Sequence, residues 1–105
     1  MEKLIPAILI GVNTDRGSYQ KDVASLEELS LLAETAGFSA VHSILHKRVK
    51  IDPGWYIGAG KARQIRSIVK EFKAEAVLFD FELTPVQLRN PEEVLKCRIM
   101  SRTEL

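Results

Sequence analysis

Residues 4–12 read Leu-Ile-Pro-Ala-Ile-Leu-Ile-Gly-Val, an unbroken aliphatic run without a charged side chain. A strand with one face in water alternates apolar and polar residues, whereas a strand covered on both faces of a parallel sheet does not. The run therefore predicts a buried strand, with Pro6 near its start because proline cannot donate to the ladder. A chain built around such a strand needs helices on both faces of its sheet.

Three further strands follow at intervals that leave room for helices between them. Residues 38–49 are rich in β-branched and aliphatic side chains, and their polar insertions favour an edge of the sheet. Residues 76–79, Ala-Val-Leu-Phe, predict a short buried strand, and residues 96–100 supply the last one. The alternation predicts an α/β fold: a small four-stranded, mainly parallel sheet flanked by helices, Rossmann-like and three-layered, with strand order 2-1-3-4.

Cap and turn signals mark the ends of the three expected helices. Ser25 and Glu28 form a capping-box pattern at the predicted start of the first helix, and Gly37 is its left-handed C-cap. Thr84-Pro85 begins the third helix, in which Asn90-Pro91 predicts a kink or a restart. An apolar stripe at helical spacing predicts the second helix; its members are Ala62, Ile65, Val69 and Phe72.

A length of 105 residues with 46% hydrophobic side chains predicts one soluble globular domain spanning residues 1–105. The single cysteine, Cys97, cannot form an internal disulfide, which favours a reducing cytoplasm. No secretory leader is visible, and no apolar run reaches the roughly 18 to 20 residues that span a bilayer, so a membrane association is not expected. Because the sequence stops directly after a strand, we expect it to be part of a longer protein.

Positive charge is concentrated in the middle of the chain, although the whole chain carries a net charge of only +1. Residues 47–73 contain eight Lys and Arg against two Asp and Glu, a net charge of +6. Two interpretations are open for the basic side chains of the second helix: a solvated face, or a surface that contacts RNA phosphates. Arg63, Arg66, Lys70 and Lys73 follow helical spacing, and Lys61 adds to their charge.

The sequence Gly58-Ala59-Gly60-Lys61 suggests a phosphate-binding loop, since glycines admit an anion to the backbone and a lysine attracts it. The match to a Walker A loop is poor, because Trp55 stands at the position of its first glycine and Ala62 replaces its hydroxyl residue. An alternative function is nevertheless a small ATP-binding or weakly ATP-hydrolysing domain. Its site would use Tyr56, Gly58, Gly60 and Lys61, with Asp80 placing a magnesium ion.

No residue pattern identifies a catalytic or metal site. His42 and His46 lie four residues apart in an expected strand, which separates them by roughly 13 Å, too far to share one ion. Asp15, Asp80 and Glu82 follow strands, where acid–base residues often lie, but no nucleophile with an adjacent base accompanies them. We therefore expect no catalytic residue in this chain.

The chain carries two motifs in a fixed order. The first is Tyr56-Ile-Gly-Ala-Gly-Lys61, and the second is Phe79-Asp-Phe-Glu-Leu-Thr-Pro-Val-Gln-Leu-Arg-Asn90, followed by Arg102-Thr103. Together they resemble the N-terminal domain of the HflX family of ribosome-associated GTPases. The resemblance covers nearly all of the chain. Three residues differ from the family pattern: Ala59, Pro91 and Ser101. Ala59 matters most for the nucleotide alternative, because it lacks the hydroxyl that could meet a phosphate.

The resemblance implies a cytoplasmic protein in which this domain is followed by a helical hairpin and a G domain that binds GTP and Mg²⁺. It implies docking on the large ribosomal subunit and its rRNA, and it also keeps the ATP alternative open. The leading hypothesis is thus a non-catalytic RNA and ribosome docking module whose charge comes from the basic side chains at positions 61, 63, 66, 70 and 73. We expect no GTP hydrolysis by these 105 residues, since the elements that hold the phosphates are absent.

Large apolar side chains at Trp55, Tyr56 and Ile57 lie in an expected loop. Such groups would be partly exposed unless the helical or G domain of the parent chain covers them. We therefore expect weak self-association of the isolated domain near Trp55.

Overall fold

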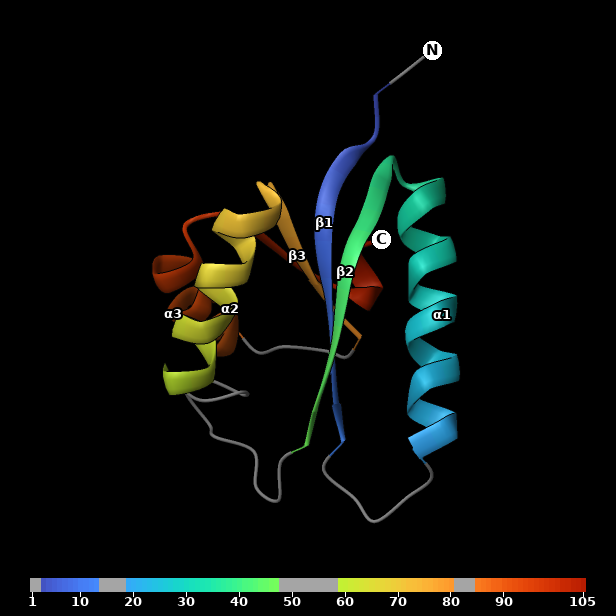
Figure 1. The fold of residues 1–105 in the computed structure, drawn as a ribbon, viewed down its shortest axis with the longest axis horizontal. Coiled ribbons are helices and arrows are strands. Elements are labelled where there is room, and N and C mark those ends of the chain that lie inside the picture. Colours follow the sequence, from blue (N-terminus) through green and yellow to red (C-terminus); the bar gives the residue numbers. More distant parts are fainter. Residues whose placement is uncertain (1–2, 14–18, 48–58, 81–84) are drawn as a thin grey trace.

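The computed structural model describes residues 3–13, 19–47, 59–80 and 85–105 (Figure 1). All four strands lie parallel in one sheet of order β2-β1-β3-β4, which confirms the predicted α/β fold and strand order. The elements in chain order are β1 (Ile5–Asn13), α1 (Tyr19–Thr35), β2 (Phe38–Lys47), α2 (Ala59–Phe72), β3 (Ala76–Phe79), α3 (Pro85–Leu95), β4 (Arg98–Ser101) and the short 3-10 helix η1 (Arg102–Glu104).

Helices cover the two faces of the sheet unequally, with α1 on one face and both α2 and α3 on the other (Figure 1). The aliphatic run predicts this arrangement correctly, because its side chains alternate between the two cores. Ala7 and Leu9 pack on the α1 side, whereas Ile8 and Ile10 pack on the side of α2 and α3, and all four are fully buried. Pro6 is the second residue of β1, near the strand start as expected.

Two predictions about the helices are wrong. Helix α1 begins at Tyr19, so Ser25 lies inside it and caps nothing, because the side chains of Ser25 and Glu28 have tertiary partners instead. Helix α3 begins at Pro85 as predicted but runs without interruption through Asn90-Pro91. Pro91 has no N–H group, so the helix continues with one backbone hydrogen bond fewer.

The edge strand β2 carries one residue more than its partner. Ala40 is opposite Ala7 and His42 is opposite Ile8, so Val41 is an extra residue that forms a β-bulge. Gly11 lies further along β1, where a Cβ atom would come within 3.2 Å of the side chains of Leu26 and Leu45. This close approach lets α1 pack directly on the junction of β1 and β2.

Each helix ends at a residue in the left-handed conformation. Gly37 ends α1 with φ 96°, as predicted, but Lys73 and Lys96 occupy the same position after α2 and α3, both with φ 52°. The N–H groups of Lys73 and Ala74 donate to Lys70 and Val69 at 3.3 and 2.9 Å, which completes a Schellman motif. A side chain in this conformation costs roughly 1 kcal/mol that glycine avoids.

We predict that Lys73→Gly and Lys96→Gly each raise the free energy of unfolding by about 0.5–1 kcal/mol, because glycine relieves the left-handed strain. Urea denaturation followed by circular dichroism measures the change. Lys70→Gly is the matched control, since it removes the same side chain from inside α2 and should lower stability by about 1 kcal/mol. Lower stability in the variants at positions 73 and 96 would contradict the strain argument.

Candidate functional site

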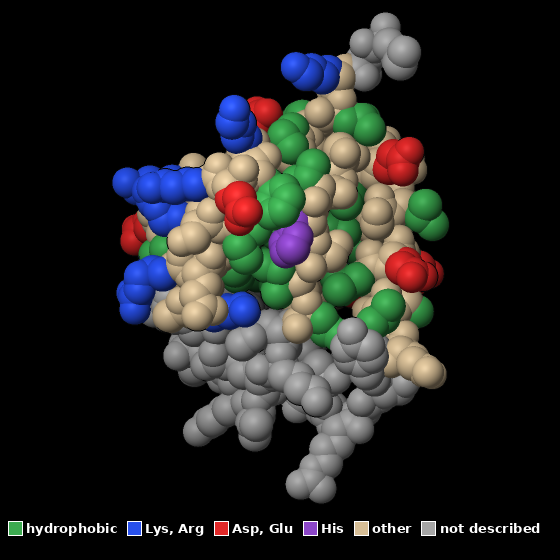
Figure 2. Space-filling view, in the orientation of Figure 1, with side chains coloured by type: hydrophobic (Ala, Val, Ile, Leu, Met, Phe, Trp, Pro, Cys, Tyr) green, Lys and Arg blue, Asp and Glu red, His purple; other side chains and the backbone are tan. Residues whose placement is uncertain are grey.

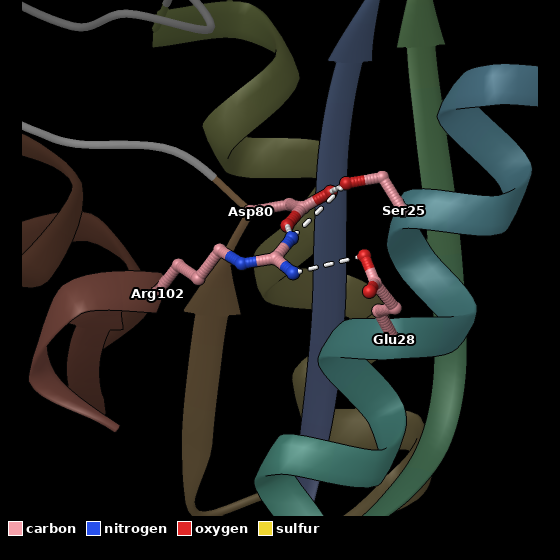
Figure 3. A network of polar contacts seen from close by, with 4 residues as sticks. All are labelled: Ser25, Glu28, Asp80 and Arg102. Atoms are coloured by element: carbon pink, nitrogen blue, oxygen red, sulfur yellow. Dashed lines mark hydrogen bonds and ion pairs between the residues drawn. The ribbon is translucent and has the colours of Figure 1, made fainter.

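Four polar side chains from three parts of the chain meet at the carboxyl edge of the sheet (Figure 3). We call Ser25, Glu28, Asp80 and Arg102 the Asp80 network. Asp80 directly follows β3, and its N–H donates to the carbonyl of Ile10 at 2.9 Å, which fixes it beside β1. Ser25 and Glu28 come from α1, and Arg102 begins η1 after β4. The network therefore ties α1 to the ends of two adjacent strands.

The Arg102 guanidinium connects every member of the Asp80 network. Its Nη1 donates to Asp80 Oδ1 at 2.5 Å and to Ser25 Oγ at 3.1 Å, and its Nη2 pairs with Glu28 Oε2 at 3.2 Å. The Ser25 hydroxyl donates to the other carboxylate oxygen of Asp80, Oδ2, at 2.5 Å. Both oxygens of Asp80 are therefore engaged inside the domain.

The two acidic partners of Arg102 differ strongly in how far their side chains are buried. The side chain of Asp80 is 7% exposed, that of Arg102 is 33% exposed and that of Glu28 is 71% exposed. The hydrogen bond to Asp80 raises the pKa of Arg102, and the negative charges of Asp80 and Glu28 act in the same direction, while partial burial opposes them. The guanidinium thus stays charged throughout the working pH range and neutralises a buried carboxylate.

We predict that Arg102→Ala lowers the free energy of unfolding by about 2–3 kcal/mol, because it leaves the buried Asp80 carboxylate without its cation. Chemical denaturation of the variant measures the loss. Glu28→Gln is the control: its exposed ion pair is worth at most about 0.5 kcal/mol. Combining Arg102→Ala with Asp80→Asn should cost clearly less than the sum of the two single changes. Equal losses in Arg102→Ala and Glu28→Gln would show that the network does not hold the domain together.

The basic side chains of α2 do not share one environment. Arg63, Lys70 and Lys73 are exposed, whereas Lys61 is half-buried in the first turn. Arg66 is also half-buried, and its Nη1 donates to the carbonyl of Val94 at 2.7 Å, in the last turn of α3. Lys and Arg side chains gather on the side of the molecule formed by α2 and α3 (Figure 2). Arg66 therefore links α2 to α3, whereas Arg63 and Lys70 of α2 face solvent.

The residues of the nucleotide alternative are not brought together among the described residues. Gly60 is exposed in the first turn of α2, and a Cβ atom there would meet nothing within 4 Å. Asp80 directs its carboxylate toward α1, on the opposite face of the sheet from α2 and Lys61. Tyr56 and Gly58 lie outside the described residues, as does Trp55.

His42 packs against an aromatic ring. Its ring stacks on Phe72 of α2 with the centroids 4.9 Å apart and the planes at 22°. In the described ranges, no group of three or more His, Cys, Asp or Glu is arranged to hold a metal. The helices of these ranges are also too short or too polar to cross a membrane.

Cys97 lies between α3 and β4, partly buried against the core that faces α2 and α3. Burial, and secondarily the negative charge of Glu92, raises the pKa of the Cys97 thiol from 9.0 to about 11. The thiol is therefore neutral and weakly nucleophilic at physiological pH.

We predict that this thiol makes stability depend on pH in the alkaline range. The folded pKa lies above the unfolded value, so stability is unaffected below about pH 9 and falls as the pH rises toward about 11. Between pH 8 and pH 10 the wild type should lose about 1 kcal/mol more than Cys97→Ala, as measured by urea denaturation. Parallel pH profiles for the two proteins would contradict the assignment.

Sequence reasoning missed the Asp80 network, although part of the signal was present. Asp80 and Arg102 each follow a strand directly, and adjacent parallel strands end at the same edge of a sheet. An acid and a base in those two positions indicate an ion pair. The partners from α1 carried no such signal, because Ser25 and Glu28 form a local pattern that is typical of a helix start.

Comparison with known proteins adds independent information about the chain. The sequence model of a family described as GTP-binding GTPase N-terminal matches residues 23–105. A protein named GTPase HflX from Lacrimispora saccharolytica is 41% identical over 96 residues, which are 91% of this chain and 22% of that relative.

Further relatives with the same name come from other organisms. The GTPase HflX of Escherichia coli is 40% identical over 84% of this chain, and that of Flavobacterium psychrophilum is 35% identical over 93%. The matched parts are 21% and 24% of those two proteins. The chain thus spans between a fifth and a quarter of the length of these relatives.

Proposed function

The chain belongs to the HflX family of GTP-binding proteins, whose N-terminal domain it forms, and from this premise we propose that it docks its parent protein on the large ribosomal subunit. In this proposal the domain binds rRNA and performs no catalysis itself. The parent protein binds GTP with Mg²⁺ and hydrolyses it in a separate G domain, and it works in the cytoplasm.

The exposed basic side chains of α2 support this proposal best. Arg63 and Lys70 are exposed on α2, and Lys73 is exposed directly after it, which suits contact with a phosphate backbone. The Asp80 network supports it in a second way, because Arg102 neutralises Asp80 and both carboxylate oxygens of Asp80 are already engaged inside the domain. A docking role therefore fits the described side chains better than a catalytic one.

We predict that Arg63→Gln combined with Lys70→Gln weakens binding of the full-length protein to purified large ribosomal subunits about tenfold. The slope of log affinity against log salt concentration should become flatter by about 2, since two phosphate contacts are lost. Sedimentation or fluorescence titration over a series of salt concentrations measures both quantities. Arg66 is left unchanged, because its substitution would also remove the hydrogen bond to Val94.

The matched control places the same change in net charge on the opposite face of the sheet. Gln20 and Ala24 are exposed on α1, so Gln20→Glu combined with Ala24→Glu also lowers the net charge by two. This control should bind subunits with nearly unchanged affinity and salt slope. If both double variants bound subunits equally weakly, the loss of affinity would come from the overall net charge, which would contradict a specific docking face on α2.

A further inference from the structure

We propose that an aromatic patch at the junction of α2 and β2 binds an unpaired base of rRNA by stacking. The patch consists of His42 and Ile44 of β2 and of Ile68 and Phe72 of α2. This proposal rests on the proposed docking function, because it adds a second kind of contact with the same RNA.

The face of the sheet toward α2 and α3 is closed over three strands and open over the fourth. On this face the side chains of β1, β3 and β4 are buried; they are Ile8, Ile10, Val77, Phe79 and Ile99. The outer strand β2 contributes His42 and Ile44 to the same face, and both are only half-buried. The outer edge of this face therefore leaves apolar surface in contact with solvent.

Phe72 departs from the apolar stripe of α2. Ala62, Ile65 and Val69 are buried in the core, as their helical spacing predicts. Phe72 in the last turn is instead 37% exposed. Its ring stacks on His42 of β2, with the centroids 4.9 Å apart and the planes at 22°. An exposed aromatic ring at the surface is a site on which a flat base can stack.

The charge beside the patch identifies RNA as the partner. Helix α2 carries four cationic side chains and one acidic side chain, Glu71, and Lys73 is exposed directly after Phe72. Figure 2 shows hydrophobic side chains around a histidine on the same face of the molecule as Lys and Arg side chains. Proteins that bind single-stranded nucleic acid combine a positively charged surface with aromatic rings in this way. A basic surface of a partner protein would be repelled by the same cations.

The first test uses Phe72→Leu in the full-length protein, which removes the ring but keeps an apolar side chain. Binding to purified large ribosomal subunits is measured by fluorescence titration over a series of salt concentrations. Stacking releases no counterions, so we expect the affinity to fall at least about fivefold while the salt slope stays that of the wild type. Phe72→Trp is the matched control, which keeps an aromatic ring and should bind within about twofold of the wild type.

Wild-type affinity in Phe72→Leu would overturn the stacking proposal. A flatter salt slope in this variant would also overturn it, because the ring would then act by positioning the cations. Failure of the docking function is distinguishable, since Arg63→Gln combined with Lys70→Gln removes charge without removing the ring. If that double variant weakens binding and Phe72→Leu does not, docking stands and only the stacking is wrong.

Glu71 tests the sign of the charge on the partner. This residue is exposed and directly precedes Phe72, so its carboxylate repels a phosphate near the patch. Glu71→Gln should therefore raise the affinity for subunits by about two- to threefold at low salt. Weaker binding by this variant would indicate a positively charged partner and would overturn the assignment to RNA.

The last test identifies what lies on the patch. Phe72 is replaced by the photoreactive amino acid p-benzoylphenylalanine, and the full-length protein is irradiated in its complex with large subunits. The crosslinked products are then separated and sequenced. We expect a crosslink to an unpaired nucleotide of rRNA. A crosslink to a ribosomal protein, or to another domain of the same chain, would overturn the proposal.

Discussion

Burial of β1 on both faces is the constraint on which the rest of the structure depends. Ala7 to Ile10 are completely buried, with alternate side chains in two different cores. A strand in this position needs neighbours on both sides for its backbone, and β2 and β3 supply them. The crossover from β1 to β2 through α1 and the crossover from β2 to β3 through α2 then run in opposite directions across the sheet, which places their helices on opposite faces.

The same topology determines where the Asp80 network forms. Strand order reverses between β1 and β3, and the carboxyl ends of such strands enclose the crevice in which α/β folds commonly bind ligands. In this domain Asp80 stands at that point and is neutralised by Arg102, which directly follows the adjacent strand β4. An internal ion pair thus takes the place that a ligand contact occupies in other members of the fold class.

Long-range patterns were predictable from the sequence, whereas the partners of individual polar side chains were not. The strand at residues 76–79 follows from a run of apolar residues, and the sheet order follows from the right-handedness of strand–helix–strand crossovers. Neither depends on the partner of any single polar side chain. The capping role expected of Ser25 was wrong, and the hydrogen bond of Arg66 to Val94 was not foreseen, for a common physical reason. Helical spacing and cap patterns describe neighbours along the chain, but Asp80 and Val94 reach these side chains from elements 55 and 28 residues away. The lysines that end α2 and α3 were unexpected in the same way, because glycine is the usual residue there.

The bulge at Val41 has a consequence for how the domain behaves among other proteins. Strand β2 is an outer strand whose free backbone groups could recruit an extended segment of another chain. One extra residue in the middle of this strand breaks the regular repeat of donors and acceptors and increases the local twist. A foreign strand can therefore pair with β2 over only a few residues on either side of Val41. The bulge thereby limits sheet extension at the β2 edge, where no lysine, arginine or acidic residue lies between Phe38 and Leu45.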